Sequence, residues 1–224
     1  GLDCGLLDQP PPVNTTSGVC GVVFWRFFRF CVLPDHNRRA TLPSMADKKK
    51  SGPSVELVPE GDTRARLVCP DCGYIAYENP KVVVGAVCLW EEKVLMCRRA
   101  IAPREGFWTI PAGFMELGES TADGAAREVW EEACSRIEVT SLIGIYEVPR
   151  ISQVHVFYRA RMTSPDFAVG VESREVALFA WDRLPWDELA FPSVIWALKQ
   201  SRESDVPVVV SAPDDSWPAE FSAV

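Results

Sequence analysis

Three glutamates fall within five residues near the middle of the chain, at Glu128, Glu131 and Glu132. Residues three and four apart share one face of a helix, so a helix here brings three carboxylates into one region. Their mutual repulsion destabilises such a helix unless a cation lies among them. Carboxylate oxygens bind hard divalent cations such as Mg²⁺, which would replace repulsion with coordination. A solvated acidic face without a ligand is the alternative interpretation.

The residues around these glutamates predict a domain that mixes strands and helices. Ser120 and Thr121 can cap a helix over about 122–134, and Asp123 suits the positive end of its dipole. Runs rich in apolar and β-branched residues on both sides are typical of strands, and a second helix closes the pattern. Strands are expected at 81–90 and 93–100, joined as a hairpin, and at 136–148, 154–162 and 175–184, with the closing helix at 191–203. This order predicts an α/β or α+β domain.

The charge balance bears on the class of partner. The 224-residue chain carries 31 acidic and 23 basic residues, for a formal net charge of -8. An acidic chain argues against a nucleic-acid partner, which binds through basic surfaces. It favours a small-molecule substrate whose phosphates are approached through bound cations. The apolar run at 19–33 is too short to span a membrane and is interrupted by Arg26 and Arg29, so no membrane partner is expected.

The spacing around the glutamates is the most specific feature of the chain. The order is Gly113, five residues, Glu119, seven residues, and then Arg127-Glu128-Val129-x-Glu131-Glu132. This resembles the Nudix box, G-x5-E-x7-R-E-U-x-E-E-x-G-U, in which U is a bulky aliphatic residue. Cys134 and Ser135 depart from it, standing where the box has Gly and an aliphatic residue. Because the Gly of the box ends the helix in a left-handed conformation, we expect this helix to end differently or to run about one turn longer.

The resemblance implies a fold, a reaction and roles for particular residues. It implies a Nudix α/β/α sandwich with a mixed sheet, preceded by a small ribbon-like segment. The glutamates would bind Mg²⁺ or Mn²⁺ bridging a diphosphate, with the carbonyl of Gly113 as a further ligand. Glu119 and Arg127 would form a structural pair. The reaction would be hydrolysis of a nucleoside diphosphate derivative, with a glutamate taking the proton of the attacking water.

The segment RARLVCPDCGYIAYENPKVVVGAV, residues 64–87, narrows the resemblance. It is similar to bacterial NADH pyrophosphatases and to the plastid Nudix hydrolases of plants that cleave FAD or ADP-ribose. FAD, giving FMN and AMP, and ADP-ribose are therefore the leading substrates, and NADH is the next. A catalytically silent Nudix domain used for binding or regulation is the alternative from another class. Residues 146–156 are where we expect substrate choice to be decided.

The ribbon-like segment raises the question of zinc. Cys69 and Cys72 form a CxxC pair, whereas a zinc ribbon needs four ligands, usually two such pairs. Residues 55–68 contain no Cys or His, so the segment predicts a ribbon turn without zinc unless ligands come from elsewhere or from a second subunit. A homodimer is expected from the relatives.

Other candidate site residues lie outside the box. Glu175 is expected to be a further metal ligand by resemblance to the bacterial enzymes, with Glu172 as the alternative. Arg98 or Arg99 would contact a phosphate, or the two form a solvated basic pair. Trp108 would stack on a base or flavin, or belong to the core. His155 is expected to be structural or to line the pocket.

Four segments are predicted along the chain. They are an extension at 1–54 that is disordered or used for targeting, the ribbon-like segment at 55–80, the Nudix domain at 81–203 and a flexible tail at 204–224. Residues 1–44 are rich in Arg, contain Ser and Thr, and are poor in acidic residues. They are either part of an organelle transit peptide, which places the protein in the chloroplast, or lie upstream of a true start at Met45, which places it in the cytoplasm.

Overall fold

The computed structural model describes residues 52–211, which form two compact units, 52–78 and 79–211. The predictions for the first 51 residues, including the two readings of 1–44, lie outside the described residues, as does the end of the predicted tail at 212–224. No helix within 52–211 is long and apolar enough to cross a membrane.

The smaller unit is a three-stranded antiparallel sheet of β1 (Val55–Leu57), β2 (Arg66–Val68) and β3 (Ile75–Ala76). Within 52–78 only Pro59 and Cys69 are buried, so this sheet has almost no core of its own. A unit of this size usually needs a metal, a disulfide or a partner surface for stability.

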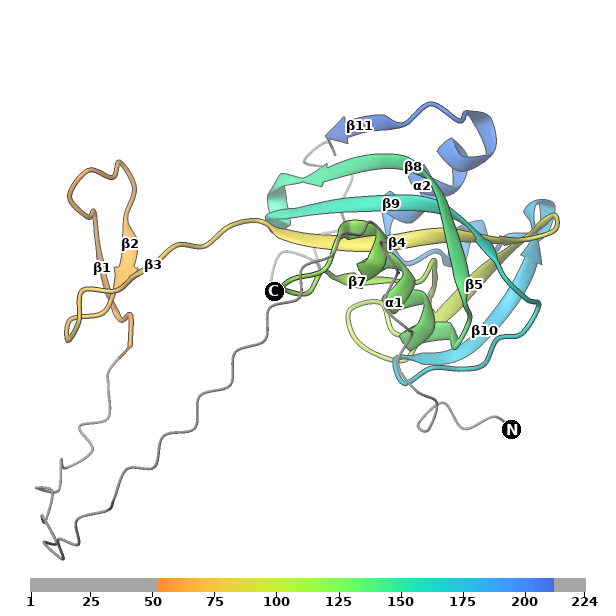
Figure 1. Cartoon of the computed structure of the whole chain (residues 1–224), viewed down its shortest axis with the longest axis horizontal. Helices are drawn as coiled ribbons and strands as arrows, with labels where there is room; N and C mark the ends of the chain where they lie inside the picture. The colour runs from red at the N-terminus through yellow and green to blue at the C-terminus, as the bar shows by residue number, and fades with distance from the viewer. Residues whose placement is uncertain (1–51, 212–224) are drawn as a thin grey trace, which may run out of the picture. The chain divides into compact units, whose positions relative to one another are not determined.

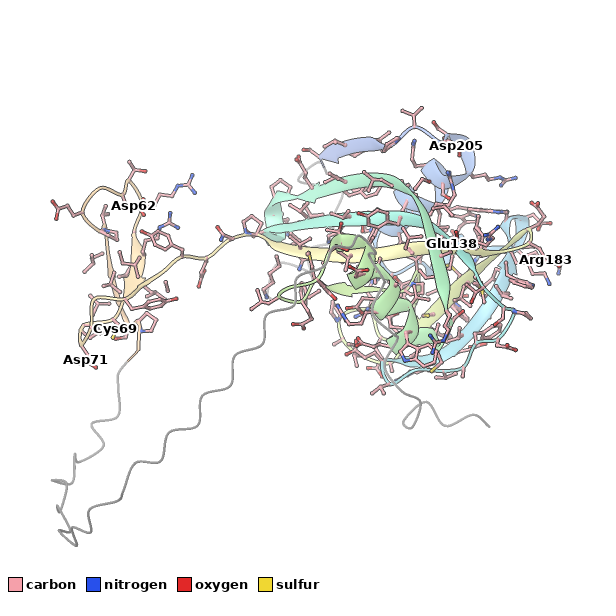
Figure 2. The ribbon with its side chains drawn as sticks, in the orientation of Figure 1. Asp62, Cys69, Asp71, Glu138, Arg183 and Asp205 are labelled. Atoms are coloured by element: carbon pink, nitrogen blue, oxygen red, sulfur yellow. The ribbon has the colours of Figure 1, made fainter. Side chains whose placement is uncertain are left out.

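The turn between β2 and β3 carries the CxxC pair. The Gly73 N–H donates to the Cys69 carbonyl at 2.9 Å, and the Cys69 N–H donates to the Tyr74 carbonyl at 2.8 Å. Gly73 has a φ of 74°, which this tight turn requires and glycine adopts without strain. Figure 2 shows Cys69 and Asp71 at one end of the unit and Asp62 in the loop at its other end.

The larger unit is built on an eight-stranded mixed sheet (Figure 1). Six of the strands follow the order β10-β5-β4-β9-β8-β11, and the other two, β6 and β7, pair with β5 and β4. The β4–β9 and β8–β11 pairs are parallel, and the β8–β9 and β5–β10 pairs are antiparallel. Its strands are β4 (Lys81–Trp90), β5 (Lys93–Arg99), β6 (Trp108–Thr109), β7 (Ala112–Phe114), β8 (Ile137–Val148), β9 (Gln153–Met162), β10 (Ser173–Ala180) and β11 (Val208–Ser211).

β4 and β5 form the predicted hairpin and then separate. The turn is at Glu91, whose φ is 52°, and Cα pairing is confined to the two residue pairs next to it. Farther along, β7 pairs with β4 and β6 pairs with β5, so the β6–β7 segment fills the space between the two strands. This arrangement places Gly113, opposite Val84 of β4, against the carboxylate of Glu128 on the first helix.

Two helices, α1 (Thr121–Ala133) and α2 (Pro192–Glu203), pack on opposite faces of the sheet (Figure 1). Alternating residues of β4 separate two cores: Val87 packs in the cluster that contains α2 residues, and Ala86 packs in the cluster that contains α1 residues. Three short 3₁₀ turns, η2 (Pro149–Ile151), η3 (Trp181–Arg183) and η4 (Trp186–Glu188), complete the unit. The predicted α/β/α sandwich is confirmed.

The end of α1 corrects one expectation. Ser120 caps its start as predicted, accepting the N–H of Asp123 at 3.2 Å. Its last residue is Ala133, and Cys134 takes the left-handed conformation with φ 48° and ψ 31°. The prediction of a different or longer end was therefore wrong, because the backbone stops where a glycine would stop it. The following loop explains this: Ala168 and Gly170 donate to the carbonyls of Ala133 and Glu132 at 2.9 and 3.0 Å and so satisfy the helix end.

The segment after residue 203 corrects a second expectation. Residues from 204 onward were expected to be flexible, yet β11 pairs in parallel with β8, from Val208 opposite Gly144 to Ser211 opposite Glu147. Proline frequency suggested a loop, but Pro207 lies just before the strand, where no ladder hydrogen bond is lost. Three consecutive valines then extend the edge of the sheet.

Candidate active site

A cleft of about 1100 Å³ is lined by residues of α1, β7, β9, the start of α2 and the loops beside them. Its lining divides into two chemically different parts. The charged part comprises Arg99, Arg127, Glu128, Glu131, Glu132 and Glu172. The neutral recess comprises Ile151, Gln153, His155, Phe157, Phe191 and Ser193. All three members of the recess at 151–155 fall in the segment 146–156 that was expected to decide substrate choice.

Arg127 joins the loop before α1 to the carboxylates of the helix. Its Nε and Nη2 donate to the two oxygens of Glu119 at 3.0 and 2.9 Å. Its Nη1 donates to Glu128 at 2.8 Å and to Glu131 at 2.9 Å. The hydrogen bonds from Arg127 lower the pKa of Glu119, and the same pairing raises the pKa of Arg127. The Arg127 guanidinium thus holds together three glutamates that the spacing singled out.

Glu128 and Glu132 are buried at the base of the cleft, with 7% and 6% of their surfaces exposed. Burial raises the pKa of Glu128. For Glu132, burial and then repulsion from Glu128 raise the pKa to about 8, against a smaller opposing effect of Arg99. A bound cation would offset the cost of ionising these two neighbouring buried carboxyls.

The three glutamates of the box do not yet form one coordination site. Within residues 52–211 no three His, Cys, Asp or Glu side chains are grouped so that they could hold one ion. Glu131 differs from the other two: its side chain is 55% exposed and pairs with Arg127, whereas Glu128 and Glu132 are buried. The donor chemistry still fits a hard divalent cation, because Glu128 and Glu132 offer buried carboxylate oxygens. The backbone of Gly113 lies directly against the Glu128 carboxylate, with no side chain between them.

Glu172, not Glu175, joins the acidic residues. Glu172 lines the cleft, and its charge acts on both Glu128 and Glu132. Glu175 was predicted as a further metal ligand, but its carboxylate pairs with Arg98 at 3.3 Å and does not line the cleft. Glu172 lies just before β10 and lines the cleft, whereas Glu175 lies within the strand, opposite Arg98 of β5.

Of the two arginines considered for phosphate binding, only Arg99 reaches the cleft. Neighbouring residues of a strand face opposite sides, and Arg98 donates to the Gly106 carbonyl at 2.8 Å instead. The Arg99 Nε donates to the Pro103 carbonyl at 2.8 Å, and its guanidinium lies 5.0 Å from the centre of the Phe191 ring. Burial lowers the pKa of Arg99, while Glu132 acts in the opposite direction.

Trp108 belongs to the core, so its predicted role in stacking on a substrate was wrong. It is 5% exposed and meets the ring of Phe179 edge-on at 4.9 Å. The alternative of core packing is confirmed. An indole of this size contributes more by filling the α2 side of the sandwich than it could at the surface.

His155 lines the cleft as a buried, neutral residue. Its Nδ1 lies 3.0 Å from Ser193 Oγ and its Nε2 lies 3.0 Å from Gln153 Oε1. Burial lowers the pKa of His155 to about 4. Ser193, Gln153 and Phe191 were not singled out from the sequence. Gln153 lies in the segment 146–156 that the sequence pointed to, whereas Ser193 and Phe191 come close to it only because α2 packs beside β9.

In the ribbon unit, Cys69 is buried and Cys72 is exposed. Hydrogen bonds from the backbone N–H groups of Cys72 and Asp71 lower the pKa of Cys69. Two thiols provide half of a four-ligand zinc site, and the described residues offer no group of three or more ligands. The residues of 52–78 therefore do not fit a zinc ion held by this unit alone.

Comparison with known families gives two matches. A model of the NUDIX domain matches residues 79–202, more than half of the chain. A model described as Nudix N-terminal matches residues 52–78. The two matches divide the chain where the described structure divides into its two compact units.

Individual relatives extend the comparison. The chain is 29% identical over 122 residues to an ADP-ribose pyrophosphatase of Methanocaldococcus jannaschii, covering 53% of this chain and 71% of that protein. It is 35% identical over 99 residues to a MutT-like protein of Streptomyces ambofaciens, with 44% and 60% covered. It is 29% identical over 126 residues to an NAD-capped RNA hydrolase NudC of Edwardsiella ictaluri, with 53% and 46% covered. The chain thus spans less than two thirds of the second and third of these relatives.

Solved structures support the fold. The crystal structure of a NUDIX hydrolase from Nitrosomonas europaea is 44% identical, with a TM-score of 0.65, and the match covers 70% of this chain and 94% of that one. A second NUDIX hydrolase from the same organism, at 22% identity and a TM-score of 0.51, is similar in fold.

Proposed function

The chain belongs to the Nudix hydrolase family, and we propose that it uses Mg²⁺ or Mn²⁺ to hydrolyse the diphosphate linkage of a nucleoside diphosphate derivative. Water adds to one phosphorus atom and the bridging P–O bond breaks, which leaves two monophosphates. FAD would give FMN and AMP, and ADP-ribose would give AMP and ribose 5-phosphate.

One observation carries this proposal. Glu128 and Glu132 are buried together at the base of a large cleft, where burial raises the pKa of both carboxyls and repulsion from Glu128 raises that of Glu132 further. A core helix that served only for packing would not hold two carboxylates in this way, because burying an unneutralised charge is costly. Carboxylates held close together in a cleft are typical of a cation and phosphate site.

The residues of the chain divide the work of the reaction. Glu128 and Glu132 would hold the cation together with the Gly113 carbonyl and Glu172, and Glu131 would join them on leaving Arg127. A bound divalent cation neutralises phosphate oxygens and lowers the pKa of a water ligand. Arg99 would contact the phosphates through its guanidinium. A carboxylate of α1 accepts the proton of the attacking water, and the Glu119–Arg127 pair keeps the loop in place.

The comparisons support the substrate class more than any single substrate. One relative is named an ADP-ribose pyrophosphatase and another an NAD-capped RNA hydrolase, which favours an adenine dinucleotide type of substrate for this chain. FAD is proposed only on the resemblance to the plant enzymes, and NADH follows it. A silent binding module is disfavoured because Glu128, Glu131 and Glu132 are all present.

The test is an activity panel. Purified protein with Mg²⁺ is assayed against FAD, ADP-ribose, NADH and capped RNA, beside a Glu131→Gln, Glu132→Gln double variant. The expected result is hydrolysis of at least one of FAD, ADP-ribose and NADH, and its loss in the variant. Inactivity across the panel, or equal activity in the variant, would contradict the proposal.

A further inference from the structure

The neutral recess contains a row of three polar side chains that the proposed chemistry does not use. Ser193 of α2, His155 of β9 and Gln153 at the start of β9 are linked by contacts of 3.0 Å on each side of the imidazole. Ser193 and His155 are buried, with 1% and 5% of their surfaces exposed, whereas Gln153 is only partly buried. The row therefore runs from the interior to the cleft surface.

The chemistry of the groups fixes the direction of each hydrogen bond. The amide oxygen of Gln153 only accepts, so Nε2 of His155 carries the hydrogen and donates to it. Nδ1 then accepts from the hydroxyl of Ser193. With its oxygen engaged by His155, Gln153 has its NH₂ group left for other partners, and that group only donates.

Apolar side chains border this row. Ile151 and Phe191 pack against buried Val148. The ring of Phe157 lies 5.6 Å from that of His155, centre to centre. Aromatic and aliphatic walls with one oriented polar group are typical of a site for a planar ring.

Arg99 connects the recess to the charged part of the cleft. Its guanidinium lies 5.0 Å from the centre of the Phe191 ring, and its charge acts on Glu132 and Glu172. One molecule can therefore place a diphosphate beside Arg99 and the glutamates while its ring enters the recess.

We propose that the recess binds the heteroaromatic ring of the substrate and that the Gln153 amide donates to an acceptor nitrogen or oxygen on the ring edge. His155 is a positioning residue, which holds that amide in one orientation with the help of Ser193. This inference rests on the proposed function, because it assigns the second part of the same substrate. Adenine and isoalloxazine rings both present such acceptors, so the two possible sources need separate tests.

The first test measures binding of AMP and of FMN, without divalent cation, to the wild-type protein and to Gln153→Leu. Loss of one neutral hydrogen bond should weaken binding of the recognised mononucleotide by about 3- to 10-fold. Gln200→Leu is the matched control, since Gln200 donates to the Val206 carbonyl and does not line the cleft. In hydrolysis assays the same variant should raise KM more than it lowers kcat. Weaker AMP binding assigns the recess to adenine, and weaker FMN binding assigns it to the flavin.

A double-mutant cycle tests the role of His155. His155→Phe should weaken binding in the wild-type background and have little further effect in the Gln153→Leu background, because it acts through that amide. Ser193→Ala, a smaller change, gives the same cycle if His155→Phe does not fold. Unchanged binding of both mononucleotides in Gln153→Leu, or fully additive effects in the cycle, would overturn the inference. Because these measurements need no hydrolysis, they separate its failure from that of the proposed function.

Discussion

The carboxylate of Glu128 packs so closely on the backbone of Gly113 that a β-carbon at residue 113 would lie 2.4 Å from Oε2. These two residues come from β7 and α1, which the sequence separates by a loop. Their contact explains why the glycine at the start of the box spacing matters in this chain. It is not a turn glycine; it leaves room for the buried carboxylate of Glu128.

Gly113→Ala should therefore displace Glu128 and damage the site more than the fold. We expect kcat to fall about 10- to 100-fold, since small misplacements of a catalytic group have effects of this size. Activity is measured per folded protein, with thermal unfolding recorded in parallel. A variant that unfolds normally and keeps wild-type kcat would show that the Glu128 position is not critical.

Glu172→Gln and Glu175→Gln form a matched pair. Glu172 lines the cleft, whereas Glu175 is a half-exposed partner of Arg98. We expect Glu172→Gln to lower kcat/KM about 10- to 100-fold, and Glu175→Gln to have little effect because an exposed ion pair contributes little. Measured rates in the opposite order would restore Glu175 as the ligand.

Mg²⁺ should stabilise the wild-type protein through its buried glutamates. A ligand at about 100 times its Kd adds about 2.7 kcal/mol to the free energy of unfolding, which raises Tm by several degrees. The Glu128→Gln, Glu132→Gln double variant should lose this shift. The control is Glu138→Gln, because Glu138 is exposed and pairs with Arg161 on the sheet surface. A shift that persists undiminished in the double variant places the cation elsewhere.

Much of the fold could be predicted because its signals are local. The hairpin of β4 and β5 and the cap of α1 at Ser120 depend on short-range periodicity and on one side chain. β11 could not be predicted this way, since an edge strand gains its stability from β8, more than 60 residues earlier. Proline near a strand and proline within a loop look alike in the sequence.

The candidate site likewise has residues whose positions local sequence predicts and residues whose positions it does not predict. The spacing of Gly113, Glu119 and Arg127 identified residues that do meet, because a helix and its preceding loop fix them together. The choice between Glu172 and Glu175 depended on where β10 begins and on the pairing of Glu175 with Arg98, and neither can be read from the residue types. Trp108 was equally ambiguous, since an aromatic residue suits both a core and a binding surface.

Residues 205–211, which include β11, should contribute to the stability of the larger unit. A chain ending at Ser204 loses β11 and also Asp205, which pairs with Arg159 at 2.6 Å. Compared with a chain ending at Ser211, we expect a loss of about 1 to 3 kcal/mol in the free energy of unfolding, because the strand pairing and the packing of the partly buried Val208 and Val210 are lost. Urea unfolding of the two chains measures the difference. Equal midpoints and slopes would mean that β11 pairs too weakly to matter.

His155 should make stability depend on pH in the acidic range. Its pKa is lowered from about 6.5 in the unfolded chain to about 4 by burial, so the folded protein holds the neutral ring. As pH falls below 6.5 the unfolded chain takes up a proton first, which favours unfolding. The contribution of His155 to the free energy of unfolding is therefore fully present above pH 6.5. It falls by up to about 3 kcal/mol as pH approaches 4. Glu132, with its raised pKa, acts in the opposite sense over part of this range.

A comparison of two proteins separates the effect of His155 on stability from that of Glu132. Urea unfolding at pH 7, 6 and 5 is measured for the wild-type protein and for His155→Asn, which cannot titrate, and the Glu132 contribution cancels because both proteins retain that residue. The difference between the two free energies should shrink as pH falls. NMR of the imidazole gives an independent check, with assignment by the His155→Asn spectrum. A His155 resonance that titrates near pH 6.5 would show that burial does not lower the pKa of this ring.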